Sequence, residues 1–77
     1  MNFFTDKVIK YNEKKLNDAI LELKFHQKIK KRLETELKSI DDNSDDIKKE
    51  IFRENNIINL WEKNIIKIKE QIEKLQK

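Results

Sequence analysis

Large apolar residues recur at alternating spacings of four and three along the second half of the chain. This spacing is a heptad repeat, the pattern of a helix that packs along another helix. A more polar repeat of the same spacing runs through the first half. The pattern predicts two helices, each of which buries one row of side chains against the other. The first row is Ile9, Asn12, Leu16, Ala19, Leu23, His26, Lys30, Leu33, Leu37 and Ile40, and the second is Ile47, Ile51, Glu54, Ile58, Trp61, Ile65, Ile68, Ile72 and Leu75.

The two patterns are separated by the run Asp-Asp-Asn-Ser-Asp-Asp at residues 41–46. Ser44 or Asn43 fits as the N-cap of the second helix, because either side chain accepts hydrogen bonds from the free N–H groups of a first turn. Thr5 fits the same role for the first helix. We therefore expect an all-α, antiparallel two-helix coiled-coil hairpin. The predicted domain spans residues 1–77, with a helix over 5–41, a turn over 41–44 and a helix over 44–76.

Charged residues within the two rows indicate how the helices are aligned. A register that places Leu37 opposite Ile47 also places Lys30 opposite Glu54, so the charges in the two rows meet. A register shifted by one heptad places Lys30 over Trp61 instead, where a cation–π contact is the available interaction. The match of opposite charges favours the first register. With His26 nearby, the sequence predicts a polar layer of His26, Lys30 and Glu54 that fixes the pairing of the helices.

The composition narrows the fold class further. The chain of 77 residues has no glycine, proline or cysteine, and 43% of its residues are charged. Tight β-turns favour glycine and proline, so a β-sheet fold is disfavoured, and disulfides are excluded. No apolar run reaches the roughly 18 residues of a membrane span, and the charges at Asp6 and Lys7 leave no room for the apolar region of a signal peptide. We expect a cytoplasmic protein with no membrane partner.

Several large apolar residues lie outside the two rows. A two-helix seam buries little apolar surface, so additional apolar residues on both helices suggest a second interface. The expected form is a homodimer that closes into a four-helix bundle, and a heterologous protein partner is the alternative. The residues expected at this interface are Phe25, Ile29, Phe52, Ile57, Leu60 and Ile66.

Lysines gather on the side of the first helix opposite its apolar row. Lysines along one face, flanked by Tyr11 and Phe25, have the arrangement that tracks a phosphate backbone. The outer positions of most coiled coils are charged and solvated, so this feature also has a purely structural explanation. The residues of the expected nucleic-acid face are Lys7, Lys10, Lys14, Lys24, Lys28, Lys31 and Arg32, with Lys38 continuing the row.

Catalytic and metal-binding patterns are not found in the sequence. His26 is the sole histidine and has no cysteine to complete a zinc site. The acidic turn lacks the glycine and the bidentate glutamate that an EF-hand loop requires at fixed positions. There is no glycine-rich phosphate loop and no serine–histidine pair with a placed acid. We expect no enzymatic activity, no cofactor and no bound metal.

Two functions follow from these patterns. The first is a non-catalytic helical-hairpin module that acts by self-association or by docking into a larger assembly. The second is a small regulator or inhibitor, of the type encoded by phages and mobile elements, that binds nucleic acid or a nucleic-acid-processing enzyme through the basic face of the first helix.

Overall fold

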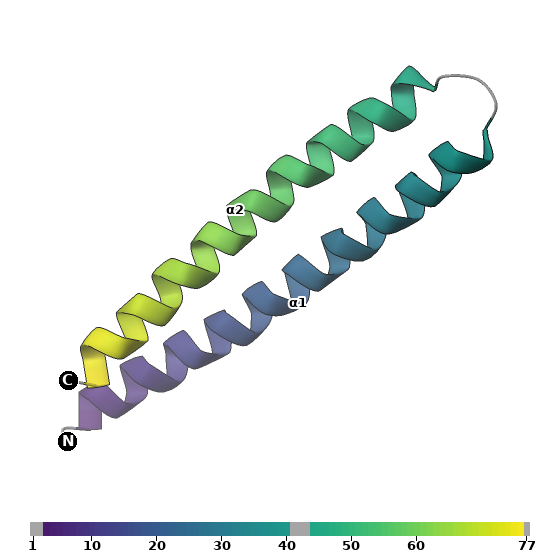
Figure 1. Ribbon diagram of the computed structural model, residues 1–77. Coiled ribbons are helices and arrows are strands. Elements are labelled where there is room, and N and C mark those ends of the chain that lie inside the picture. The colour runs from purple at the N-terminus through teal and green to yellow at the C-terminus, as the bar shows by residue number, and fades with distance from the viewer. Residues whose placement is uncertain (1–2, 41–43, 77) are drawn as a thin grey trace.

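The computed structural model is a hairpin of two long helices that run antiparallel, side by side, along their whole length (Figure 1). Helix α1 spans Phe3–Ser39 and α2 spans Asp45–Gln76, within described residues 3–40 and 44–76. The hairpin is 61 Å long and about 14 Å across, measured on Cα atoms. The start of α1 and the end of α2 lie at the same end of the rod, which we call the open end.

The predicted rows form the seam between the helices. Six apolar residues are buried, and all of them belong to the rows: Ile9, Ala19, Leu33, Ile58, Ile65 and Ile68. The other row members are buried or half-buried as well, with one exception. Ile40 is 41% exposed because α1 ends one residue before it. The heptad pattern therefore gives the core correctly up to the end of the first helix.

The packing around Ala19 confirms the register. Ala19, Ile65 and Ile68 form the best-buried cluster, and the residues packed around it are Leu16, Ile20, Leu23, Trp61 and Ile72. The predicted register pairs Leu16 with Ile68 and Ala19 with Ile65, which agrees with this cluster. Alanine at the centre lets the two backbones approach closely enough for isoleucines of α2 to cover it.

Helix α2 begins with the predicted N-cap, Ser44. The backbone N–H of Ile47 donates to Ser44 Oγ at 3.3 Å, and Lys48 N–H donates to the Ser44 carbonyl at 3.2 Å. Asp45 and Asp46 occupy the first turn of α2, where negative charge is favoured by the helix dipole. Asn43, the alternative cap, lies outside the described residues.

Helix α1 differs from the prediction at both ends. It begins at Phe3, so Thr5 lies inside the first turn and is not the N-cap. The helix ends at Ser39, two residues before the predicted end at 41. Residues 41–43, which contain most of the predicted turn, lie outside the described part of the chain. The apolar row alone locates these ends poorly because helix termini depend on local capping.

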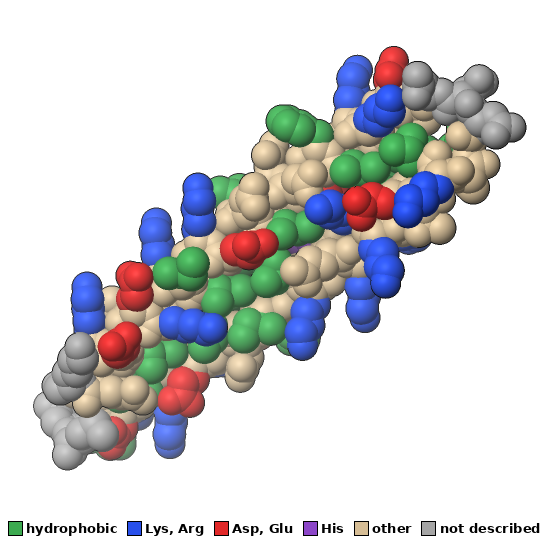
Figure 2. Space-filling view, in the orientation of Figure 1, with side chains coloured by type: hydrophobic (Ala, Val, Ile, Leu, Met, Phe, Trp, Pro, Cys, Tyr) green, Lys and Arg blue, Asp and Glu red, His purple; other side chains and the backbone are tan. Residues whose placement is uncertain are grey.

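The space-filling view shows how little of the apolar surface is enclosed. Apolar side chains form a line between the two rods, and lysine, arginine and acidic side chains project on both sides of it (Figure 2). No residue among those described has a large side chain with less than 2% of its surface exposed. The hairpin therefore has a thin core that solvent reaches from both flanks.

Replacing Ser44 with alanine tests the cap of α2. We expect Ser44→Ala to lower the free energy of unfolding by about 1 kcal/mol, because the N–H of Ile47 loses its acceptor. Thr35→Ala is the matched control. The Thr35 hydroxyl is exposed and donates to the Lys31 carbonyl within α1, so its loss should change stability by less than about 0.5 kcal/mol. Urea unfolding followed by circular dichroism measures both. Equal effects of the two substitutions would contradict the assignment of the cap.

Candidate interaction site

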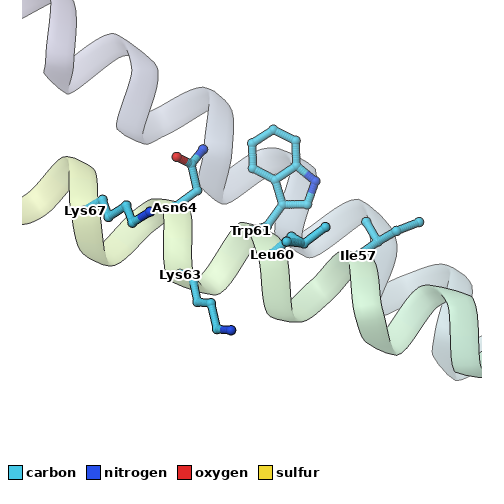
Figure 3. A pocket seen from close by; sticks show the side chains of 6 residues that line it. All are labelled: Ile57, Leu60, Trp61, Lys63, Asn64 and Lys67. Carbon is cyan, nitrogen blue, oxygen red and sulfur yellow. The ribbon is translucent and has the colours of Figure 1, made fainter.

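One flank of the hairpin carries apolar residues from both helices. Trp61 is half-buried in the seam and lies at the centre of this flank. Ile57 and Leu60 lie beside it on α2, and Figure 3 shows the Trp61 indole pointing toward α1. Leu60 is 67% exposed. An exposed leucine beside a partly exposed tryptophan marks a surface where further apolar burial is available.

Phe25 and Ile29 of α1 belong to the same flank. Asp18 and Glu22 of α1 line a depression together with Trp61. Phe25 lies seven residues after Asp18, and Ile29 lies seven residues after Glu22. Seven residues are close to two full helical turns, so they return to the same side of the helix. Phe25 is 57% exposed and Ile29 is half-buried. We refer to Phe25, Ile29, Ile57, Leu60 and Trp61 as the apolar patch.

A shallow groove continues from the patch toward the open end. It consists of three adjoining depressions, and Asn64 lines each of them. The groove walls change from apolar at the patch to charged further along. Lys63 points away from α1, whereas Asn64 points toward it (Figure 3). The charged and polar residues that line the groove beyond the patch are Asn12, Lys15, Asp18, Glu22, Asn64, Lys67 and Gln71.

The six residues expected at the second interface do not form one surface. Phe25, Ile29, Ile57 and Leu60 come together in the patch. Phe52 and Ile66 are 68% and 56% exposed, but their heptad positions place them on the opposite flank of α2. Heptad position therefore separates Phe52 and Ile66 from the other four, because counting apolar residues outside the seam does not distinguish its two flanks. A role for Phe52 and Ile66 at an interface stays a prediction.

The polar layer forms with a different pairing from the predicted one. Nδ1 of His26 lies 2.6 Å from Oε2 of Glu54, and Nε2 lies 3.8 Å from Oε2 of Glu22. A carboxylate only accepts hydrogen bonds, so His26 donates through Nδ1. The Glu54 side chain is 8% exposed. This hydrogen bond therefore satisfies a carboxylate that is almost fully buried.

Lys30 does not take the role that its charge predicts. It is half-buried, and no ion pair joins it to Glu54 or to any other residue in the described ranges. A lysine at a seam position can keep its alkyl stem against the helices while its ammonium group reaches water. The shorter imidazole of His26 stays in the seam, one turn from Lys30, and binds Glu54. Matching formal charges overlooked this because it placed His26 in the polar layer without pairing it with Glu54.

The aromatic ring of Phe25 connects the polar layer with the patch. Its centroid lies 5.2 Å from that of His26, with the rings at 76° to each other. The edge-to-face arrangement covers one side of the imidazole. The His26–Glu54 hydrogen bond is therefore shielded from solvent in part by a residue of the apolar patch.

Removing one partner of the His26–Glu54 pair should lower the free energy of unfolding more than removing both partners. We expect His26→Leu to lower the free energy of unfolding by about 3 kcal/mol, because Glu54 remains buried without its donor. The double variant His26→Leu with Glu54→Leu should unfold within about 1 kcal/mol of the parent, since both polar groups are gone. Urea unfolding gives the four values of this cycle. A double variant whose loss of unfolding free energy equals the sum of the losses in the two single variants would contradict the pairing.

The predicted basic face lies along the outer side of α1. Lys7, Lys10, Lys14, Lys24, Lys28, Lys31 and Arg32 are all exposed, as is Lys38. Arg32 is at the edge of this row, toward the flank that carries the patch. The ammonium group of Lys7 also lies 4.7 Å above the ring of Phe3. The structure thus presents the lysines to solvent along one side, away from α2.

The described ranges contain neither a metal-binding cluster nor a membrane-spanning segment. In the described ranges, no group of three or more histidine and acidic side chains is placed to hold a metal ion. Within the same ranges, neither helix contains a segment long and apolar enough to cross a membrane.

The sequence alone did not identify the groove, because Asn64 and Lys67 appear as ordinary surface positions until the partner helix is placed beside them.

Comparison with known proteins gives no relative for this chain: no family model matches it, and neither a curated protein nor a solved structure does.

Proposed function

We propose that this protein is a non-catalytic helical-hairpin interaction module, and that its apolar patch binds a second copy of the chain. The observation that carries the proposal is the placement of Phe25, Leu60 and Trp61 on one flank, with apolar residues supplied by both helices. The hairpin buries a single row of side chains from each helix. A second hairpin packed on this flank would bury apolar side chains that the seam leaves exposed. The cytoplasm remains the compartment expected from the sequence.

A two-fold axis through the patch makes the surface self-complementary. The axis crosses the flank between Phe25 and Ile29 on α1 and between Ile57 and Leu60 on α2. Each helix then packs antiparallel against the same helix of the other copy, as a two-fold interface requires. Phe25 of one copy faces Ile29 of the other, and Ile57 faces Leu60. Lys15 comes level with Ser39, so the copies overlap from there to the turn.

Charges around the patch agree with this arrangement. The same rotation brings Glu22 opposite Arg32 on α1, and Glu50 opposite Lys67 on α2. It also brings Asp18 opposite Glu36, one unfavourable pair toward the rim. Because each pair occurs twice in a symmetric dimer, four attractive pairs stand against two repulsive ones. Complementary charges at the rim of an apolar contact select the partner and the register more than they add affinity.

A charge placed in the patch should prevent self-association. We expect the parent chain to have a mass near twice 9.4 kDa, and Leu60→Glu to have the mass of a single chain, because a carboxylate cannot be buried there without a partner. Phe52→Glu is the matched control, because Phe52 is equally exposed but lies on the opposite flank. Light scattering behind a sizing column measures all three. A monomeric parent, or dissociation caused equally by Phe52→Glu, would overturn the proposal.

Reversing one rim pair tests the two-fold axis itself. Glu50 and Lys67 are 17 positions apart on one helix, about 25 Å along its axis, so they cannot meet within one chain. Glu50→Lys and Lys67→Glu should each weaken the dimer roughly tenfold, since each places like charges together twice. The double reversal should restore the parent dissociation constant to within about threefold. Sedimentation equilibrium gives the constants. A double variant as weak as either single variant would rule out this axis.

A further inference from the structure

The outer side of α1 carries positive charge alone. Its b and f heptad positions hold seven lysines and no aspartate or glutamate: Lys7, Lys10, Lys14, Lys24, Lys28, Lys31 and Lys38. The corresponding positions of α2 mix Lys49 and Lys63 with Asp45, Glu70 and Glu73. A face that is merely solvated needs no such separation of charge, and α2 shows the mixed pattern. We refer to the seven residues as the lysine stripe.

Apart from Lys7, whose ammonium group lies over the ring of Phe3, the ammonium groups of the stripe are available for a ligand. None of the seven lysines forms an ion pair with any residue in the described part of the chain. The acidic residues of α1 lie nearer the seam, at e, g and c positions. The seven positive charges exceed the formal net charge of +3 for the whole chain. The stripe is therefore a concentrated positive field on a protein that is only mildly basic.

The lysines form two clusters along the helix axis. Lys7, Lys10 and Lys14 lie near the open end, and Lys24, Lys28, Lys31 and Lys38 lie nearer the turn. At 1.5 Å per residue the cluster centres are about 30 Å apart. The outer positions between them hold Asn17 and Leu21, which carry no charge. A straight helix thus presents two groups of cations separated by an uncharged interval.

We infer that the lysine stripe binds the phosphate backbone of duplex DNA. One helical turn of the duplex is about 34 Å, so a straight rod lying along it crosses the same backbone strand at two places about one turn apart. The two lysine clusters are about 30 Å apart, and flexible lysine side chains accommodate the small difference from the length of one duplex turn. The uncharged interval then spans the two grooves, and the crossing of the other strand, that lie between these places. This recognition is electrostatic and independent of base sequence.

Other polyanions fit the stripe less well. An acidic membrane surface is usually bound by a helix with a large apolar face, and the b and f positions of α1 contain Leu21 as their one aliphatic residue. Single strands are held by stacking on aromatic rings, and Tyr11, at the edge of the stripe, lies under the ammonium group of Lys15 at 5.7 Å. The inference does not depend on the apolar patch, which lies on a different side of α1.

Binding of the whole chain to a fluorescent duplex of about 20 base pairs, two turns long, tests the inference. Anisotropy is measured over a salt series. Lys24→Gln with Lys28→Gln and Lys31→Gln should weaken binding more than about tenfold at low salt. It should also reduce the slope of log K against log salt by about 2.7, because three phosphate contacts are lost. Glutamine favours helix nearly as well as lysine, and circular dichroism checks that the variant folds.

The control variant removes the same charge from the other helix. Lys49→Gln with Lys63→Gln and Lys69→Gln should leave affinity and slope within about twofold of the parent, since these exposed residues lie on α2. Equal losses of affinity in the two triple variants would show that binding depends on the net charge alone, and this would overturn the inference. Absence of binding at low salt would overturn it as well. So would equal or tighter binding to a single strand, to duplex RNA, or to phosphatidylserine vesicles at matched charge.

Discussion

The seam between α1 and α2 provides all of the buried apolar residues in the described chain. Two helices can share one seam, so each hides one row of side chains and leaves the rest of its surface in water. Everything else in the molecule follows from this limit. The core is thin, and the surfaces that the described residues offer for function are the two flanks of the seam and the outer sides of the helices.

The polar residues in the seam determine the one alignment in which the apolar rows fit. Asn12 is buried and bonds the carbonyl of Val8 in its own helix at 2.8 Å, which satisfies it without a partner from α2. His26 and Glu54 satisfy each other across the seam. A shift by one heptad to the register that places Lys30 over Trp61 would separate this pair and leave a buried carboxylate without a donor, at a cost of several kcal/mol. The His26–Glu54 hydrogen bond therefore contributes specificity of register, whereas the isoleucines contribute most of the burial.

Heptad spacing was sufficient to predict the hairpin, its core and its alignment, because each depends on which residues share a helix face. Finer features depend on side-chain reach and on the neighbouring helix. Matching formal charges paired Glu54 with Lys30, but the shorter side chain of His26 takes the position beside Glu54. Phe52 and Ile66 were grouped with Leu60 because all are apolar, and only the flank separates them. The groove around Asn64 exists through the combination of both helices, so neither half of the sequence contains it.

Distances between spin labels on two copies test the central claim, that the patch closes onto a second hairpin about a two-fold axis. The chain has no cysteine, so a single Lys28→Cys or Lys7→Cys variant carries one label. With the axis between Phe25 and Ile29, labels at position 28 should lie close together, on the order of 20 Å apart across two packed helices. Labels at position 7 should lie about 60 Å apart along the rod. A short distance at position 7, or no dipolar coupling at position 28, would contradict the account.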